Sequence, residues 1–401
     1  MKYIVILCDG MADEPLEALG GKTPLEAART VNMDLLAKDS EVGMVRTVPE
    51  GMAPGSDTAN LSVIGYDPRR YYTGRSPLEA LSIGAPMGPE DVSFRCNIVT
   101  LSEEEEKYED RHILDHSAGE ISTEEAAELI EALRIGLKRE GYSFYVGTSY
   151  RHLLIQKNGR VVELTAPHDI LTKRIGEYLP GDPVLREMME KSYDILKDHP
   201  VNVKRRAEGK NPANSAWFWG AGTRPALASF REKNGVNGAM ISAVDLLKGI
   251  AAGAGMHNIF VEGANGGLNT NYAGKADAAV KALTEDGFDF VYVHIEAPDE
   301  VGHQGSMEDK IRAIENIDEK IIGPVNDALD KADISYRMLI LPDHPTPIRV
   351  RTHTGDPVPY LLYDSTQKAA GPDTYSEKTG RETGIYEETG HHLMDHLLSV
   401  K

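Results

Sequence analysis

The sequence contains little cysteine: Cys8 and Cys96 are the only two in 401 residues. Two cysteines exclude both a disulfide scaffold and a zinc site built from several thiolates. Long apolar runs are also missing. The run that begins at Tyr3 ends at Asp9, and no later run approaches the length of about eighteen residues that a membrane-spanning helix needs. We therefore expect a cytoplasmic protein with no membrane partner.

Basic residues are fewer than acidic residues in this chain. The chain has 43 Lys+Arg against 63 Asp+Glu, which gives a formal net charge of −20. Nucleic acids and anionic membranes are bound by basic surfaces, so we expect no nucleic-acid partner. With 41% hydrophobic and 26% charged residues, the composition is that of a globular protein. The length suggests two domains, or one domain that carries an insertion.

Apolar runs rich in Val and Ile predict buried strands at both ends of the chain, over Tyr3–Cys8, Phe288–Ile295 and Tyr336–Leu341. Helical spacing of apolar residues predicts helices over Thr23–Lys38 and Met307–Asp330. Alternation of strands and helices predicts an α/β fold with a doubly wound sheet. His294 lies inside one of these runs and is expected to be a hydrogen-bonded core residue.

The middle of the chain has a different pattern of predicted secondary structure. A Ser122-x-x-Glu125 pattern predicts the start of an amphipathic helix, and short strands separated by turns are predicted around it, including Arg160–Leu164. We interpret this stretch as an α+β lobe. The predicted organisation is a discontinuous core domain of residues 1–85 and 230–401, interrupted by an inserted lobe of residues 86–229.

Three aspartates follow the predicted buried strands: Asp9, Asp299 and Asp343. In an open α/β sheet, ligands bind outside the carboxyl ends of the strands, so these side chains could converge on one site. Taken singly, each aspartate is more often a turn or helix-cap residue.

Histidines near these aspartates favour a metal site. His303 follows Asp299 by four residues, His344 follows Asp343 directly, and His353 lies nine residues further on. Mixed Asp and His ligands suit divalent metals such as Mn²⁺, Zn²⁺ or Co²⁺. Six candidate ligands are too many for one catalytic ion with an open position, and they suit two ions.

Ser56 is the candidate nucleophile. It follows Gly55 and opens a predicted helix, where backbone N–H groups and the helix dipole favour a phosphate group. A serine hydroxyl next to a metal ion is a strong nucleophile for phosphoryl transfer. On its own, the position also suits an ordinary serine helix cap.

Taken together, these motifs resemble a known family. The chain contains, in order, CDGMAD (8–13), PGSDTAN (54–60), APDEVGH (297–303), PDHPTP (342–347) and RTHTGDPVP (351–359). This set is similar to the alkaline phosphatase superfamily. The motifs YYTGRSPLEA (71–80), FRCNIVT (94–100), DHSAGEIS (115–122), YRHLL (150–154) and WFWGAGTRP (217–225) resemble those of its archaeal-type cofactor-independent phosphoglycerate mutases.

The resemblance implies an alkaline-phosphatase-like core with two metal sites. One site would be formed by Asp299, His303 and His353, and the other by Asp9, Asp343, His344 and the Ser56 hydroxyl. Ser56 would be phosphorylated during turnover, in the interconversion of 3-phosphoglycerate and 2-phosphoglycerate without bisphosphoglycerate. The expected cofactors are two divalent metal ions, with Mn²⁺ favoured and Zn²⁺, Co²⁺ and Mg²⁺ as alternatives.

A phosphorylated three-carbon acid also needs cationic partners for its phosphate and carboxylate, and bidentate arginine serves this purpose best. We expect Arg151 and Arg224 to bind the substrate, with the inserted lobe clamping it. The further candidates from the family motifs are His152, His116, Arg75, Arg95 and Lys275. For any single arginine, a surface ion pair is the commoner outcome.

Other functions remain as alternatives at this stage. A metal-dependent phosphatase or a phosphopentomutase of the same superfamily would share the two-metal core. A non-catalytic binding protein is disfavoured because Ser56 and all six Asp and His ligands are present. Gly21-Lys22-Thr23 imitates a nucleotide-binding loop, but Leu16 stands where that motif requires glycine. The sequence leaves the choice between monomer and homo-oligomer open.

Overall fold

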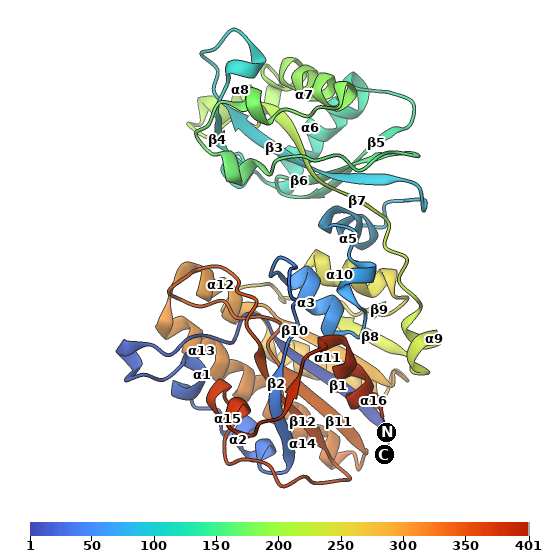
Figure 1. Cartoon of the computed structure of the whole chain (residues 1–401). Helices are drawn as coiled ribbons and strands as arrows, with labels where there is room; N and C mark the ends of the chain where they lie inside the picture. The colour runs from blue at the N-terminus through green and yellow to red at the C-terminus, as the bar shows by residue number, and fades with distance from the viewer. Residues whose placement is uncertain (400–401) are drawn as a thin grey trace. The chain divides into compact units, whose positions relative to one another are not determined.

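The computed structural model describes residues 1–399. It divides into two compact units, a core unit made of Met1–Tyr72 and the chain from Leu227 onward, and an inserted unit, Thr73–Ala226 (Figure 1). Helix α5 (Arg75–Ser82) lies in the inserted unit, because it packs on two strands of that unit. The sequence had predicted that these residues belong to the core domain. Among residues 1–399, no helix has both the length and the apolar character needed to cross a membrane.

The core unit is built on an eight-stranded sheet. In sheet order, its strands are β13 (Tyr386–Glu387), β2 (Ser40–Val45), β12 (Val358–Asp364), β11 (Tyr336–Leu341), β1 (Lys2–Cys8), β10 (Phe290–Ile295), β8 (Gly238–Ile241) and β9 (His257–Asn258). Strands β11, β1, β10 and β8 run parallel at its centre, whereas β12 is antiparallel to both β11 and β2. All residues of β10 and β11 are buried, as expected for parallel strands covered on both faces.

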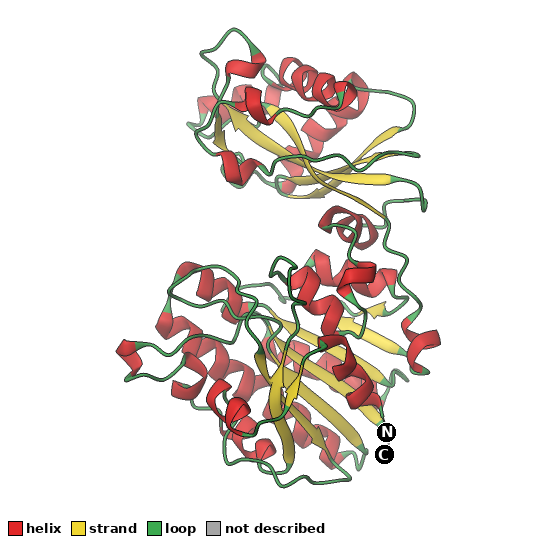
Figure 2. Cartoon of the chain, viewed as in Figure 1, coloured by secondary structure: helices red, strands yellow, loops and turns green. Residues whose placement is uncertain are grey.

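Helices cover both faces of this sheet (Figure 2). One face of the sheet is covered by four helices, which form a single apolar cluster with Ile4 and Ile6 of β1. These helices are α2 (Val31–Ala37), α11 (Tyr272–Thr284), α13 (Met307–Ile317) and α14 (Gly323–Lys331). The other helices of the unit are α1 (Pro24–Ala27), α3 (Ser56–Val63), α4 (Pro68–Tyr71), α9 (Phe230–Asn234), α10 (Asp245–Gly253), α12 (Ala297–Gln304), α15 (Glu377–Glu382) and α16 (Leu393–Leu398). The predicted doubly wound α/β fold is confirmed.

Two predicted core helices are interrupted. The helix expected over Thr23–Lys38 splits into α1 and α2, because the Asp318 carboxylate accepts the backbone N–H groups of Asn32 and Met33 and so starts a second helix. That contact comes from a distant part of the chain and leaves no local sequence signal. The helix expected over Met307–Asp330 contains a π-helical turn, Asp318–Ile322, between α13 and α14.

The inserted unit is α+β. Its five-stranded antiparallel sheet has the order β4 (Ile113–Asp115), β3 (Val92–Leu101), β6 (Arg151–Gln156) and β5 (Tyr142–Thr148), and β7 (Ser215–Thr223) also pairs with β3. Helices α6 (Thr123–Gly136), α7 (Pro183–Leu196) and α8 (Pro200–Ala207) pack in the main apolar cluster of the unit, which includes Cys96 and Phe218.

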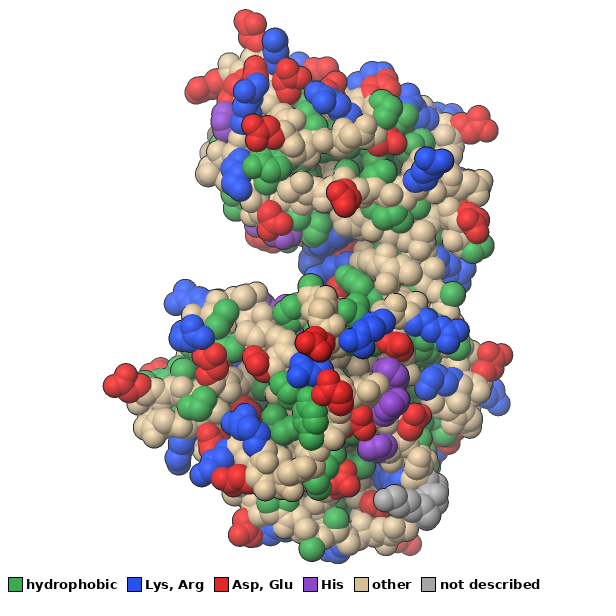
Figure 3. Space-filling view, in the orientation of Figure 1, with side chains coloured by type: hydrophobic (Ala, Val, Ile, Leu, Met, Phe, Trp, Pro, Cys, Tyr) green, Lys and Arg blue, Asp and Glu red, His purple; other side chains and the backbone are tan. Residues whose placement is uncertain are grey.

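The strand predicted over Arg160–Leu164 is wrong: these residues are in an irregular segment. Strand β6 already pairs with β3 on one side and β5 on the other, so no edge beside it is left for another strand. On the face in view in Figure 3, acidic and basic side chains are interspersed over the surface of each unit.

Candidate active site

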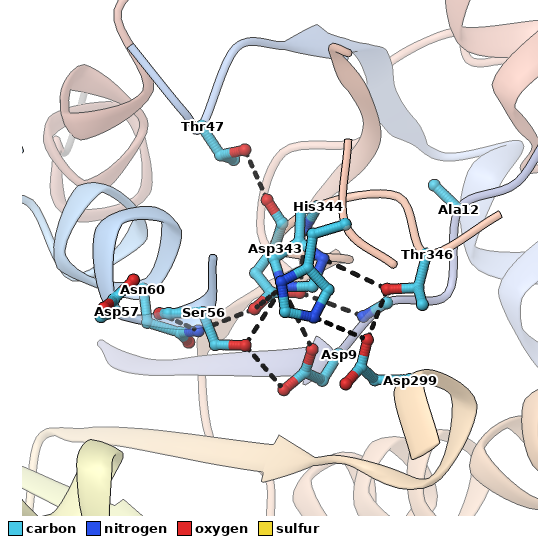
Figure 4. A network of polar contacts seen from close by, with 12 residues as sticks. Asp9, Ala12, Thr47, Ser56, Asp57, Asn60, Asp299, Asp343, His344 and Thr346 are labelled. Atoms are coloured by element: carbon cyan, nitrogen blue, oxygen red, sulfur yellow. Dashed lines mark hydrogen bonds and ion pairs between the residues drawn. The ribbon is translucent and has the colours of Figure 1, made fainter. Parts of the chain in front are cut away.

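The candidate site of the core unit lies at the carboxyl edge of its parallel strands. Asp9 directly follows β1, Asp343 and His344 follow β11, and Asp299 lies in the first turn of α12, just after β10. Because β10 and β11 both pair with β1 in parallel, the three strands end at the same edge. The structure therefore brings together aspartates that are far apart in the sequence (Figure 4).

The ligand atoms form two overlapping groups. Asp9, Asp343 and His344 make one group, and Asp299, His344 and His353 make the other, with the ligand atoms of each group within 4.8 Å of one another. His344 is shared, and its ring centroid lies 4.0 Å from that of His353. The first group contains the three Asp and His ligands of one set implied by the resemblance. The second shares Asp299 and His353 with the other implied set but has His344 in place of His303.

His303 completes the second group. Its Nε2 atom lies 3.0 Å from His353 Nε2 and 3.2 Å from Asp299 Oδ2. Its Nδ1 atom lies 2.9 Å from the carbonyl oxygen of Arg351. The backbone contact orients the ring so that Nε2 points to the other ligands, which is the arrangement found around metal-binding histidines.

The electrostatics of the site show a shortage of positive charge. Burial raises the pKa of Asp9, and the carboxylates of Asp343 and Asp299 raise it further. Asp299 is the opposite case: burial raises its pKa, but hydrogen bonds from His303 and His353 outweigh this effect and hold the pKa well below its usual value. The hydrogen bond with Asp299 in turn raises the pKa of His303 to about 9.

A buried carboxylate oxygen of Asp9 indicates that the negative charges of the site are balanced by cations. Among the described residues, Asp9 Oδ1 is buried and has no hydrogen-bond partner. A buried carboxylate oxygen without a donor is costly, and a metal ion satisfies it. Three carboxylates and three imidazoles are suitable ligands for transition-metal ions. The residues present thus fit two divalent cations.

Ser56 is next to the first ligand group. It is the first residue of α3, and its Oγ atom lies 3.1 Å from His344 Nε2 and 3.5 Å from Asp9 Oδ2. The side chain makes no helix-capping hydrogen bond, and the N-cap position belongs to Gly55. The hydroxyl therefore points to the ligand groups and does not satisfy its own helix (Figure 4).

Several residues that the sequence analysis did not assign to the site hold its ligands in place. Asn60 Nδ2 donates to Asp343 Oδ2 over 2.8 Å, and its Oδ1 atom accepts from the Tyr292 hydroxyl over 2.6 Å. The Thr47 hydroxyl donates to the Asp343 carbonyl over 2.5 Å. His294 is a buried core residue, as predicted, but its Nε2 atom also lies 2.9 Å from Asp9 Oδ2. None of these residues carries a metal-binding spacing that could have revealed it.

Gly10 is required by close packing at this edge. Its φ is +61°, and a Cβ atom there would lie 2.6 Å from both Asp299 Oδ1 and Thr346 Oγ1. Any larger residue would therefore push Asp299 away from the other ligands.

A second charged cluster lies in the inserted unit, and its centre is Arg95. The Glu79 carboxylate contacts Arg95 Nε over 3.0 Å and Arg75 Nε over 3.3 Å. The guanidinium of Arg95 stacks over Trp219 at 4.3 Å and is 6% exposed. Its Nη atoms make no hydrogen bond with any described residue. A buried guanidinium whose outer nitrogens lack partners is suited to binding an anion.

More cationic and aromatic groups surround Arg95. Burial lowers the pKa of Arg95, Glu79 raises it, and the nearby charges of Arg75 and Arg151 lower it again. His168, which the sequence analysis did not select, lies edge-on to Trp219 at 5.2 Å and to His116 at 6.1 Å. We call the set Arg75, Arg95, Arg151, His116, His168 and Trp219 the cationic cluster.

The other three sequence candidates lie elsewhere. His152 is 1% exposed and faces the apolar core with Cys96, its partner in β3, whereas Arg151 beside it points to the other face of the strand. Arg224 is exposed, and its Nη1 atom donates to the Met87 carbonyl over 3.3 Å.

Lys275 belongs to the core unit. It is fully buried and donates to the His294 carbonyl over 2.8 Å. Burial lowers its pKa to about 8. Lys275 therefore supports the strand that carries His294, and it is outside the cationic cluster.

Comparisons with known proteins agree with this geometry. Residues 37–202 match the model of a family described as 2,3-bisphosphoglycerate-independent phosphoglycerate mutase. A relative from Geobacter sulfurreducens is 50% identical over 99% of this chain and 100% of its own length, and one from Methanothrix thermoacetophila is 48% identical over 100% of both. The solved structure of a cofactor-independent phosphoglycerate mutase from Thermoplasma acidophilum has a TM-score of 0.67 and 29% identity over 99% of each chain. The chain belongs to the family of 2,3-bisphosphoglycerate-independent phosphoglycerate mutases.

Proposed function

We propose that this protein is an isomerase that interconverts 3-phosphoglycerate and 2-phosphoglycerate, a step of glycolysis and gluconeogenesis, without bisphosphoglycerate. The observation that carries the proposal is the position of the Ser56 hydroxyl, at the start of α3 and within 3.5 Å of both Asp9 and His344. Membership of the family, at about half identity over the full chain, supports the substrate.

In the proposed reaction, Ser56 Oγ loses its proton and attacks the phosphorus of the bound substrate. The bond between phosphorus and the substrate oxygen breaks, that oxygen takes up a proton, and a phosphoserine and glycerate result. The other glycerate hydroxyl then loses its proton and attacks the phosphoserine, the bond between phosphorus and Ser56 Oγ breaks, and Ser56 Oγ takes up a proton. N–H groups in the first turn of α3 would help to hold the phosphoryl oxygens.

Two divalent ions fit the ligand groups described above, with Asp9, Asp343, His344 and Ser56 at one ion and Asp299, His303 and His353 at the other. When bound, they would supply positive charge to the phosphoryl group and make the Ser56 hydroxyl more acidic. We propose Mn²⁺ as the ion, with Zn²⁺, Co²⁺ and Mg²⁺ as alternatives, because a mixed Asp and His ligand set accepts several divalent metals. Asn60, Thr47 and His294 keep Asp343 and Asp9, the ligands of the first ion, in a fixed geometry.

The cationic cluster is proposed to bind the carboxylate and the glycerate backbone of the substrate. Arg95 is positioned by Glu79 and Trp219, so little side-chain freedom is lost when an anion binds. A mutase has to retain glycerate while its phosphoryl group is on Ser56, because released glycerate leaves the phosphoserine to water. The cationic cluster would keep glycerate bound during this interval, whereas a phosphatase can release its dephosphorylated product.

A coupled assay tests this function. The protein is treated with a chelator, resupplied with Mn²⁺, and given 3-phosphoglycerate with and without bisphosphoglycerate. We expect 2-phosphoglycerate to form only after metal is added, at a rate that bisphosphoglycerate does not change. Stoichiometric release of inorganic phosphate without 2-phosphoglycerate would contradict the proposal and indicate a hydrolase.

A further inference from the structure

A fully buried ion pair lies beside the metal-ligand groups of the core unit. Lys310 of α13 contacts Asp13 Oδ2 over 2.7 Å, and both side chains are 0% exposed. The carboxylate of Asp13 also accepts the backbone N–H groups of Glu14, over 2.8 Å, and of Ile348. Two charges are kept away from water only when their partners are complete, and here the carboxylate has several donors.

The Lys310 ammonium also joins two separate segments of the chain. It donates to the Thr346 carbonyl over 2.8 Å and to the Ala12 carbonyl over 3.3 Å. With Asp13, these contacts use the three donors of an ammonium group. Ala12 and Asp13 follow Asp9, and Thr346 follows His344, so one side chain ties the segment after β1 to the segment after β11.

The third ligand-bearing segment is connected to the same point. The Thr346 hydroxyl donates to Asp299 Oδ1 and lies 3.3 Å from His344 Nδ1. Helix α13, which carries Lys310, begins shortly after α12, which carries Asp299 and His303. Figure 4 shows the Thr346 hydroxyl joined by dashed lines to both Asp299 and His344, with Ala12 on the neighbouring segment. All three segments that supply the Asp and His ligands therefore meet at Lys310 or at its partner Thr346.

We propose that Lys310, paired with Asp13, is a positioning residue that sets the spacing between the metal-binding segments. It touches no ligand itself and acts through the backbone of residues 12 and 346. Metal sites require their ligands within about 0.5 Å of the productive geometry, and three separate segments reach that precision only when they are tied together. The inference rests on the metal-dependent function proposed above.

The test replaces the pair with apolar side chains in the double variant Lys310→Met/Asp13→Leu. Replacing both members of a buried ion pair by apolar residues is often neutral for stability. We therefore expect the metal-free variant to unfold at a temperature near that of the wild type. Its affinity for Mn²⁺, measured by calorimetric titration, should fall by about tenfold to a hundredfold, the range for residues that orient metal ligands.

The control is the ion pair of Arg337 and Asp364 in the same unit, whose side chains are 8% and 13% exposed and whose charged atoms lie 2.7 Å apart at the other end of β11. The variant Arg337→Met/Asp364→Leu should bind Mn²⁺ like the wild type. If the Lys310 and Asp13 variant does not fold, Lys310→Met/Asp13→Asn replaces it, because asparagine keeps an acceptor for the N–H groups of Glu14 and Ile348, whereas methionine cannot donate to the two carbonyls. This variant, when folded, should still bind Mn²⁺ more weakly than the wild type.

The outcomes separate this inference from the proposed function. Wild-type Mn²⁺ affinity in the folded Lys310 variant would overturn the positioning role. Failure of the wild-type protein to bind Mn²⁺ would overturn the metal-dependent function itself. Equal weakening in the Arg337 and Asp364 control would show that any loss of a buried pair lowers metal affinity, and would also overturn the positioning role.

Discussion

The two charged clusters of this protein differ in the sign of the charge that would balance them. In the core unit, Asp9, Asp299 and Asp343 crowd together so closely that burial and mutual repulsion raise the pKa of Asp9. In the inserted unit, the Glu79 carboxylate contacts Arg75 and Arg95. Burial lowers the pKa of Arg95 below its usual value, and the nearby charges of Arg75 and Arg151 lower it further. The first cluster lacks positive charge and the second lacks negative charge.

This contrast accounts for both requirements of a phosphoglycerate mutase. A phosphoryl group is transferred most readily where cations offset its charge, and the core cluster is suited to hold such cations. A small acid is retained where guanidinium groups are already oriented, and under the proposed function the cationic cluster is that place.

The largest expected effect comes from removing a core ligand charge. Asp343→Asn should lower Mn²⁺ affinity at least about tenfold, because a charged ligand is lost, and mutase activity should fall below detection, because both phosphoryl-transfer steps of the proposed reaction depend on the ion. Elemental analysis should then show about one ion per chain fewer than in the wild type. Asp39→Asn is the control, because Asp39 pairs only with Lys368 at the surface. Retention of both ions in Asp343→Asn would mean that the ligand assignment is wrong.

An effect of intermediate size is expected in the cationic cluster. Arg95→Met removes a buried guanidinium and should cost about 2–5 kcal/mol in kcat/KM, the range for a buried charged contact. Phosphoserine formation depends mainly on the core unit, so phosphate release per mutase turnover should rise.

Arg224→Met is the matched comparison for Arg95→Met, because Arg224 is exposed and is held by the Met87 carbonyl. Its effect on kcat/KM should be below tenfold. A larger loss for Arg224→Met than for Arg95→Met would show that the sequence-based choice of Arg224 was right and that the cluster is misassigned.

The smallest expected effect is on stability in acid. Burial lowers the pKa of His152 to about 4, so the folded inserted unit keeps this ring neutral while the unfolded chain protonates it below about pH 6.5. Stability is therefore fully present above pH 6.5 and is lost as the pH falls toward 4, by about 3 kcal/mol in total.

Urea unfolding at pH 7 and pH 5 measures this loss. Both tryptophans of the chain, Trp217 and Trp219, lie in the inserted unit, so their fluorescence reports on that unit alone. His152→Asn keeps an acceptor for the Gly147 N–H group but cannot be protonated. It should lose less stability between the two pH values than the wild type, and an equal loss would contradict the assignment of the pH dependence to His152.

The core site could be predicted from the sequence, and the inserted cluster only in part. Asp9, Asp299 and Asp343 follow the ends of apolar strands within one to four residues, and parallel strands end at a common edge, so sequence order was enough to bring them together. The cationic cluster depends on which face of a strand a side chain occupies. Alternation along β6 puts Arg151 and His152 on opposite faces, although both were predicted to bind substrate.

Contacts between distant segments left no signal in the sequence. Glu79 joins Arg75 and Arg95 only because α5 packs against β3, and His168 lies in a short 3₁₀ turn without a recognisable pattern. Asp318 interrupts a predicted helix from nearly three hundred residues away in the chain. These features depend on tertiary packing, which local periodicity does not encode.

The central claim is that the phosphoryl group passes through Ser56, and its most direct test is to trap the intermediate. The Mn²⁺-loaded protein is mixed with phosphate-labelled 3-phosphoglycerate, quenched in acid and digested. The account predicts label on the peptide that contains Ser56, no label in Ser56→Ala, and a folded Ser56→Ala protein that still binds Mn²⁺ through Asp9, Asp343 and His344. Label on any other residue, or wild-type turnover by Ser56→Ala, would contradict it.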